Sequence, residues 1–188
     1  MAVGCGRRAG SGKDPRFILL AAMNIHRSGC LKQRLKSSLT ARADTIQHFV
    51  QDMAPHWWVY GFVAKHGRLF GPRRPLRKKS AANQPQMCFW NAYVLTSLRP
   101  ELIYVEGFAR FAIGGNQSHI VHHAWAVDSG GRVLDPTLKG TEYFGIPFKA
   151  EYVKRTMHRI LPTGFSILDN ELDSLRKSKN SKAWLFKT

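Results

Sequence analysis

Apolar residues repeat with a helical spacing just before Pro55. The positions i, i+3, i+4 and i+7 lie on one face of a helix, so the repeat predicts an amphipathic helix here. Thr40 or Asp44 is expected to cap this helix at its start, and Pro55 is expected to end it. The repeat consists of Ile46, Phe49, Val50 and Met53.

Two contrasting segments follow Pro55. Residues 57–64 are a short run of aromatic and β-branched side chains, which predicts a strand. Residues 65–80 contain several glycines, prolines and basic side chains, which predict a loop. This loop leads the chain to Cys88.

The segment Cys88–Leu98 predicts a buried helix. It contains no glycine, no proline and no charged residue, and it stops at Arg99 and Pro100. Cys88 is therefore expected in the first turn of this helix.

The rest of the chain predicts antiparallel hairpins followed by two helices. Gly114-Gly115-Asn116 and Ser129-Gly130-Gly131 are typical of the turns between strands. The lysine- and arginine-rich end beyond Arg176 is expected to be frayed. We therefore predict an α+β fold in which the helix that carries Cys88 packs on an antiparallel sheet. The predicted strands are residues 102–113, 119–128 and 132–135, and the predicted helices are residues 148–157 and 167–176.

Length and composition predict one folded domain with basic ends. The chain has 188 residues, of which 44% are hydrophobic and 11% aromatic, values typical of a folded protein. We expect a basic, poorly structured arm over residues 1–40, one domain over residues 41–176, and a basic tail over residues 177–188.

The formal net charge of +17 predicts that part of the surface attracts polyanions or acidic partners. Nucleic acid is one such partner, bound through its phosphates without regard to sequence. The aromatic run at residues 57–62 could provide stacking surfaces, although a continuous aromatic run is more often part of a core. The candidate polyanion contacts are Arg73, Arg74, Arg77, Lys78 and Lys79.

The three cysteines indicate a reducing compartment. Cys5, Cys30 and Cys88 are an odd and sparse set without CxxC pairs, so a cytoplasmic location is expected. The apolar run at residues 17–23 is too short to span a bilayer, so no membrane partner is expected. No cofactor is expected either.

A thiol at the start of a buried helix is a candidate nucleophile. The partial positive charge at a helix N-terminus and a nearby imidazolium both favour the thiolate form. Cys88 has the first feature, and a histidine of the strand at residues 119–128 could provide the second. Alternation along a strand places His119 and His123 on one face and His122 on the other, so not all three can face the thiol.

The turn after this strand tests whether Asp135 can orient His123. If Ser129-Gly130-Gly131 is a three-residue hairpin loop with a glycine in the left-handed conformation, Asp128 pairs with Arg132 and Trp125 with Asp135. His123 and Asp135 are then diagonal neighbours on one face. The carboxylate would bind one ring nitrogen of His123 and leave the other for the thiol. A two- or four-residue loop would put them on opposite faces.

Three short motifs carry a resemblance to a known family. They resemble the Cys, His-x-Trp and Asp-Pro-Thr signatures of the transglutaminase-like superfamily, whose members have a papain-like core. The resemblance covers residues 84–145, and Asp-Pro-Thr after a strand is its most specific part. It implies a cysteine hydrolase core with Cys88 as nucleophile, His123 as base and Asp135 as orienting acid. The motifs are Gln86-Met-Cys88-Phe-Trp-Asn-Ala, His123-Ala-Trp125 and Asp135-Pro-Thr137.

The residue before the thiol differs from the family pattern, and the residue that would provide the oxyanion donor is not fixed by it. Met87 stands before the thiol, where many members have a small or polar residue. The family's oxyanion donors are the backbone N–H of the nucleophile and an upstream polar side chain, for which Gln86 or Gln84 is the nearest match. The segments Tyr104–Gly107 and Tyr143–Gly145 resemble parts of small bacterial or phage proteins of this type.

Each candidate residue also has a plain structural interpretation. Cys88 among apolar neighbours is typical of core packing, and Trp125 is more often core than a substrate platform. Asp135 before a proline commonly starts a turn. None of these interpretations explains why the three motifs follow one another in this order. Glu106, inside an apolar strand, is expected to pair with Arg110 or another base, and a substrate-binding role for it is open.

A zinc site is the main chemical alternative to a cysteine hydrolase site. The histidines at positions 119, 122 and 123, with Cys88 and Asp135 or Asp128, would provide enough ligands. Strand alternation separates His122 from the other two, and the chain lacks HExxH and CxxC patterns. We therefore predict no metal.

The sequence thus predicts a thiol-dependent acyl-transfer enzyme that acts on an amide or ester bond of a protein or peptide. Protease, deamidase and transglutaminase chemistry share the thioester step, and the sequence does not choose among them. The alternative function is a basic nucleic-acid- or protein-binding protein that keeps the fold without turnover.

Overall fold

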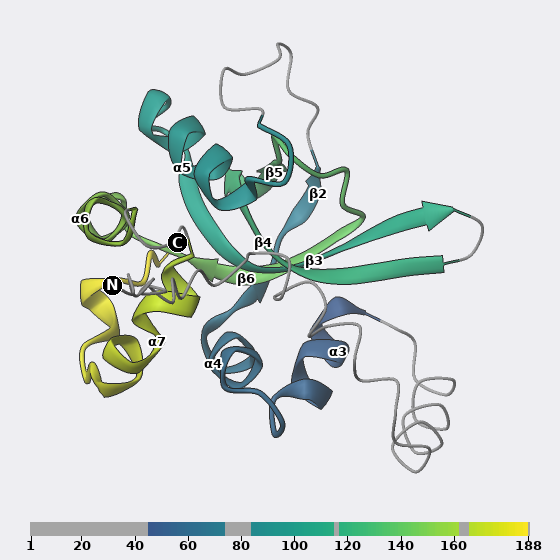
Figure 1. The fold of residues 1–188 in the computed structure, drawn as a ribbon, viewed down its shortest axis with the longest axis horizontal. Helices are drawn as coiled ribbons and strands as arrows, with labels where there is room; N and C mark the ends of the chain where they lie inside the picture. Colours follow the sequence, from purple (N-terminus) through teal and green to yellow (C-terminus); the bar gives the residue numbers. More distant parts are fainter. Residues whose placement is uncertain (1–44, 74–83, 115–116, 162–165, 188) are drawn as a thin grey trace, which may run out of the picture. The chain divides into compact units, whose positions relative to one another are not determined.

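The strands belong to one six-stranded sheet in the computed structural model of the protein, which describes residues 45–73, 84–114, 117–161 and 166–187 (Figure 1). In chain order they are Arg68–Leu69 (β1), Gly71–Arg73 (β2), Ile103–Gly114 (β3), Gln117–Val127 (β4), Arg132–Leu134 (β5) and Glu142–Pro147 (β6). Their order across the sheet is β1-β6-β3-β4-β5-β2. All neighbours are antiparallel except β2 and β5, which are parallel.

Helices and strands come in separate runs along the chain, and four of the strands follow one another without a helix between them, so the predicted α+β class is confirmed. β3 and β4 form a long hairpin whose far end extends away from the helices (Figure 1). The helices are Ile46–Met53 (α3), Trp58–His66 (α4), Cys88–Leu98 (α5), Ala150–Ile160 (α6) and Ile167–Lys177 (α7), and Ser181–Ala183 forms a short 3₁₀ helix (η2).

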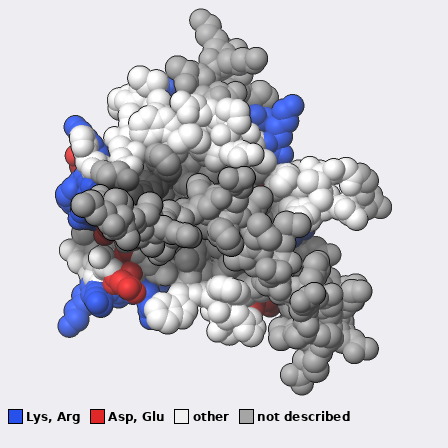
Figure 2. All heavy atoms as spheres, viewed as in Figure 1, with Lys and Arg blue, Asp and Glu red and all other residues white. Residues whose placement is uncertain are grey.

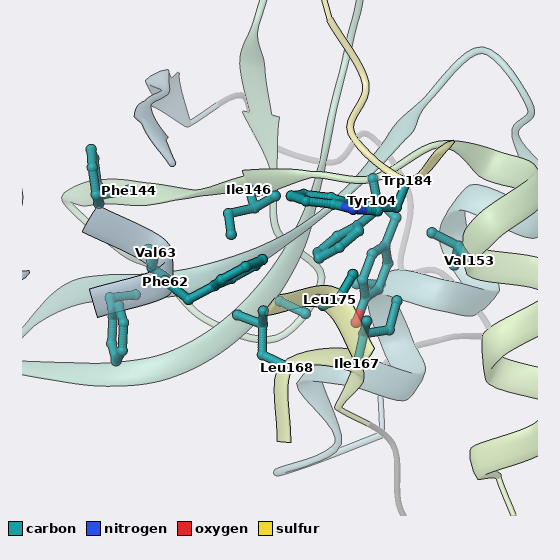
Figure 3. Packing of buried hydrophobic residues seen from close by; sticks show 14 of the residues in the cluster. Phe62, Val63, Tyr104, Phe144, Ile146, Val153, Ile167, Leu168, Leu175 and Trp184 are labelled. Carbon is teal, nitrogen blue, oxygen red and sulfur yellow. The ribbon is translucent and has the colours of Figure 1, made fainter. Parts of the chain in front are cut away.

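The sheet face that carries Phe108 and His122 packs against helices. Tyr60 of α4 stacks on Phe108 with the ring centroids 4.1 Å apart, and Phe89 of α5 meets His122 edge-on with the centroids 5.1 Å apart. The large core on this side joins residues of all five helices with the strands and Trp184. Figure 3 shows part of it, in which side chains of α4, α6 and α7 lie around Tyr104 and Trp184. Burial of this apolar surface fixes α5, and with it Cys88, on the sheet.

A smaller core covers the opposite face of the sheet around Trp125. Strands and connecting segments provide its side chains, with Phe70 and Leu138 packed against the buried members. His123 and Asp135 lie on this face, where contact with the close-packed side chains limits their movement. The buried members are Val105, Ala109, Trp125, Val127, Val133 and Tyr143.

The strand predicted for residues 57–64 is wrong, because this segment forms α4. Phe62 and Val63 lie in the core, and Val59 packs against it, which is a helical spacing of i, i+3 and i+4. Trp58 is 67% exposed. Packing of one helical face on the sheet outweighs the local β propensity of the aromatic and β-branched side chains.

Two further predictions are wrong in part. The loop predicted for residues 65–80 contains β1 and β2, and no strand was predicted for β6, which lies between β1 and β3. β6 and β3 approach closely at Gly145 and Gly107, where a Cβ added to Gly107 would lie 2.4 Å from the Cα of Gly145. Contacts with distant strands therefore define these short segments.

Two of the predicted helices are found close to their predicted positions. The helix with apolar residues at 46, 49, 50 and 53 is confirmed, but its cap is Thr45, whose Oγ1 accepts from the backbone N–H of His48 at 3.4 Å. Thr40 and Asp44 lie outside the described residues. The helix Cys88–Leu98 is confirmed in full.

The expectation of a frayed end beyond Arg176 is wrong for the segment around Trp184. The side chain of Trp184 is 2% exposed, and its carbonyl oxygen accepts from the N–H of Lys149 at 2.9 Å. The N–H of Phe186 donates to the carbonyl of Pro147 at 2.9 Å. The basic segment is thus held by a buried tryptophan at its centre.

The basic arm predicted over residues 1–40 lies outside the described residues, as do Arg74, Arg77, Lys78 and Lys79. Among the residues that the structure describes, no helix is long and apolar enough to cross a membrane.

Candidate active site

Cys88 is the first residue of α5, as the sequence predicted. Met87 precedes it in the cap position and provides no side-chain hydrogen bond to the helix. The backbone N–H groups at the start of this helix are therefore not capped by that side chain, and they contribute a partial positive charge beside the thiol. Cys88 is half-buried.

A strained turn sets the position of Cys88. Gln86 has a φ of 62°, a left-handed conformation that is uncommon for a residue other than glycine. The side chain of Asn91, one turn into α5, holds the chain before this turn: it accepts from the N–H of Gln84 at 3.0 Å and donates to its carbonyl at 2.6 Å. Asn91 also donates to Oγ1 of Thr137 at 2.9 Å, which links the turn to the Asp-Pro-Thr segment.

The predicted hairpin register is confirmed. Ala126 pairs with Leu134 and Val127 with Val133, so that the same register sets Trp125 opposite Asp135. Gly131 adopts the left-handed conformation with a φ of 72°, which the three-residue loop requires. Nε2 of His123 lies 2.8 Å from Oδ2 of Asp135, and both side chains are buried.

Asp135 receives four hydrogen bonds, enough to satisfy a buried carboxylate. Its Oδ1 accepts from the backbone N–H groups of Thr137 at 2.8 Å and Leu138 at 2.9 Å. Its Oδ2 accepts from Nε2 of His123 and from the hydroxyl of Tyr143, the latter at 2.9 Å. Two backbone N–H groups and the hydroxyl of Tyr143 already donate to this side chain, and a proton on Nε2 of His123 lets the imidazole donate as well.

This arrangement leaves Nδ1 of His123 for the thiol. Burial alone would lower the pKa of His123, but the hydrogen bonds and charges of Asp135 and Cys88 outweigh it and raise this pKa to about 9. The imidazole is therefore favoured as the cation near neutral pH. Asp135 and His123 are thus joined by a hydrogen bond, and Cys88 lies close enough to contribute to the raised pKa of the imidazole.

The three predicted supporting residues fall into two groups. Trp125 is fully buried, and its ring stacks beside that of His123 with the centroids 6.2 Å apart, so it supports the imidazole from within the core. Gln84 and Gln86 are exposed on the turn before Cys88. The two glutamines therefore lie just before the thiol in the chain, where a side-chain oxyanion donor was expected, and Trp125 does not.

Arg73 was predicted to contact polyanions at the surface, but the structure places it beside the candidate site. It is half-buried in β2, and its Nη2 donates to the backbone carbonyl of Asp135 at 3.4 Å. The guanidinium therefore belongs to the surroundings of the candidate site.

The opposite face of the sheet carries a second polar cluster centred on Glu106. This fully buried carboxylate accepts from the N–H groups of Ile167 at 2.9 Å and Leu168 at 3.0 Å, and from the hydroxyls of Tyr104 at 3.1 Å and Ser166. Of the two expected pairings, the one with Arg110 is wrong, because Arg110 pairs with Glu142 at 3.2 Å, whereas pairing with another base is confirmed by His122, whose Nε2 lies 3.4 Å from Oε1 of Glu106. Glu106 instead anchors the N-terminus of α7 to β3.

His122 belongs to this second cluster, as strand alternation predicted. Its Nε2 lies 3.4 Å from Glu106 and its Nδ1 lies 3.6 Å from Asp169. Burial lowers the pKa of His122, but the two carboxylates outweigh this effect and raise it. His119, the third histidine of β4, is exposed. Within the described parts of the chain, no three His, Cys, Asp or Glu side chains form a group that could hold a metal ion.

Two residues of the site were not identified from the sequence. Asn91 braces the turn before Cys88, and Tyr143 donates to Asp135 while its own oxygen accepts from the N–H of Gly140 at 2.9 Å. Burial and the charge of Asp135 raise the pKa of Tyr143, so the hydroxyl keeps its proton. A polar residue one turn after the thiol was a usable signal for Asn91, whereas Tyr143 lies on the strand that was not predicted.

Cys88, His123 and Asp135 come from α5, β4 and the segment after β5. The short β5 pairs with β4 only at Ala126 and Val127, so His123 lies beyond the part of β4 that pairs with β5. Comparison of the chain with models of protein families, with curated proteins and with solved structures finds no match.

Proposed function

We propose that the protein is a thiol-dependent acyl-transfer enzyme that uses Cys88, His123 and Asp135 as a triad. The observation that carries the proposal is the buried 2.8 Å hydrogen bond between Nε2 of His123 and Asp135. It fixes the proton on Nε2 and leaves Nδ1 for the thiol. The resemblance of the three motifs to the transglutaminase-like superfamily agrees with this role and with a papain-like core.

The first half-reaction forms a thioester. The sulfur of Cys88 bonds to the carbonyl carbon of an amide or ester, and the carbonyl electrons move onto the oxygen. The N–H groups at the start of α5 are the nearest candidates to stabilise that oxyanion, with Gln86 or Gln84 as a side-chain donor. As the intermediate collapses, the bond to the leaving group breaks, and Nδ1–H of His123 donates its proton to the departing nitrogen or oxygen.

The second half-reaction releases the acyl group. Water or an amine attacks the thioester carbon while Nδ1 of His123 takes its proton, and the sulfur leaves. Water gives proteolysis or deamidation, and an amine gives transglutamination. Asp135 keeps the imidazole in one orientation and balances its charge through both steps. A protein or peptide is the proposed substrate.

The raised pKa of His123 supports its role as a proton donor. With a pKa of about 9, the imidazole is mostly cationic at pH 7, so that Nδ1 carries a proton. This proton is then in place for the leaving group before the substrate arrives.

An electrophilic probe tests the proposal. The full chain is treated with a peptide that carries an acylating group, and labelled residues are located by mass spectrometry. We expect rapid labelling at Cys88 and none in the Cys88→Ala variant, whose small side chain keeps the helix intact. Cys5→Ala and Cys30→Ala should label like the wild type.

A matched pair of histidine variants locates the base. His123→Gln should slow labelling at Cys88 by at least about a hundredfold, the scale of losing a general base or ion-pair partner. His122→Gln, on the opposite face, should change the rate little. If the two effects are reversed, or if Cys88 reacts like an ordinary exposed thiol, the triad is not the basis of function.

A further inference from the structure

A groove between α4, α7 and η2 lies apart from the candidate active site. Its volume is about 560 Å³, within the range of about 300–1,000 Å³ that is typical of ligand sites. Phe62, Leu175 and Trp184, all buried, form an apolar part of its lining. No residue of the triad lines it.

The rim of this groove is positively charged. Lys65, Arg176 and Lys179 are exposed, and no aspartate or glutamate is among the lining residues. Burial and the neighbouring Lys65 lower the pKa of His66, so near neutral pH the positive charge comes from the two lysines and the arginine. Figure 2 shows Lys and Arg side chains together with Asp and Glu side chains at the edge over α6 and α7. Arg176 lies 4.0 Å from Asp173, which is not a lining residue, so the three basic side chains still leave the rim with a net positive charge. The groove is therefore suited to an anionic ligand.

An exposed tryptophan stands beside these charges. The side chain of Trp58 is 67% exposed, and the guanidinium of Arg176 lies 4.5 Å from its ring centroid. This cation–π contact holds the indole in place while most of its surface stays open. The open surface of the indole is available for stacking with a flat ring.

We propose that this groove binds single-stranded nucleic acid, with a base stacked on Trp58 and phosphates bound by Lys65, Arg176 and Lys179. Proteins that bind single strands combine a basic groove with aromatic side chains in this way. A duplex keeps its bases stacked inside, so it would leave Trp58 uncovered. An acidic peptide would satisfy the charges without a regular supply of flat rings. The proposal is independent of the acyl-transfer function.

Photocrosslinking tests the proposal with the full chain. The protein is mixed with a fluorescent oligonucleotide of twelve deoxythymidines, irradiated, digested, and the crosslinked peptide is identified by mass spectrometry. We expect a crosslink at Trp58. Crosslinks confined to residues 1–40 or 74–79 would overturn the proposal, because binding would then use other basic segments.

Affinity measured by fluorescence anisotropy provides matched controls. Trp58→Ala should weaken binding about tenfold, and Trp58→Phe, which keeps a stacking surface, should restore most of it. Trp57→Ala is the control, because Trp57 is 52% exposed but does not line the groove. Equal losses for Trp57→Ala and Trp58→Ala would overturn the proposal.

The salt dependence separates phosphate contacts from general attraction. The double variant Lys65→Ala/Lys179→Ala should make the slope of log affinity against log salt shallower by about 0.7 for each lost phosphate contact. Lys182→Ala/Lys187→Ala removes the same charge outside the groove and should change the slope less. If polyglutamate competes as well as the oligonucleotide and Trp58→Ala has no effect, the groove binds acidic protein and the proposal fails. Cys88 labelling should be unchanged in every groove variant.

Discussion

Asp135→Asn tests the link between the hairpin register and the chemistry of Cys88. In the wild type, Oδ1 of Asp135 accepts from two backbone N–H groups and Oδ2 accepts from His123 and Tyr143. The amide oxygen of asparagine must replace Oδ1, because an NH₂ group there would face two donors. The NH₂ group then faces Nε2 of His123, which favours the proton on Nδ1. A proton on Nδ1 prevents the imidazole from accepting one from the thiol or from water.

The size of the effect follows from the pKa of His123. The difference between about 9 and the ordinary value of 6.5 corresponds to on the order of 3 kcal/mol in favour of the cation. Because the folded-state pKa is raised, this contribution to stability is complete below about pH 6.5 and is lost as the pH rises through 9. In Asp135→Asn, the loss of stability between these pH values should become much smaller.

Two measurements check this prediction. An NMR titration of the imidazole C–H signals should give a pKa for His123 near 9 in the wild type and a clearly lower value in Asp135→Asn. Turnover, or acylation of Cys88, should fall by at least about a hundredfold in the variant while the circular dichroism spectrum stays the same. The double variant with His123→Gln should be little worse than either single one. A wild-type pKa near 6.5, or an unchanged rate in Asp135→Asn, would refute the reasoning.

Three other substitutions probe the structure around the site. Asn91→Ala removes three hydrogen bonds and should cost about 2 kcal/mol of unfolding free energy and slow Cys88 labelling, as urea unfolding and labelling kinetics would show, with a smaller effect for Thr137→Ala, which removes only one. Glu106→Gln places an NH₂ group among donors and should cost about 3 kcal/mol in urea unfolding, whereas Asp169→Asn, at an exposed side chain, should stay within about 0.5 kcal/mol. Gly107→Ala should cost about 3 kcal/mol by thermal unfolding, since its Cβ would lie 2.4 Å from backbone atoms of the neighbouring strand. If one of these three destabilising variants is as stable as the wild type, the contact that it removes or disturbs does not stabilise the protein, and the prediction is wrong.

Local sequence was sufficient wherever one turn or one repeat decides the conformation. The left-handed glycine of the loop at residues 129–131 fixes the register of β4 and β5, and this register alone puts His123 and Asp135 on one face. The absence of glycine, proline and charge over Cys88–Leu98 likewise defines a helix with the thiol in its first turn. The geometry of the candidate triad was therefore largely predictable.

Contacts between distant segments decided the elements that were mispredicted. Residues 57–64 carry side chains that favour a strand, yet burial of Phe62 and Val63 against the sheet makes them a helix. Glu106 has no local partner that reveals its role, because the N–H groups it binds belong to a helix that starts at Ile167. Neither outcome can be read from a short window of sequence.

The sequence by itself determined the order of the helix and hairpins and the face on which His123 and Asp135 meet, because strand alternation and turn chemistry act over a few residues. Only the tertiary structure decided which groups support that pair. Tyr143 reaches Asp135 from β6, and Asn91 joins the turn before Cys88 to Thr137, 46 residues further along the chain. Such contacts depend on how the segments pack together, and burial of apolar surface, which has no direction of its own, sets that packing only when the whole core forms.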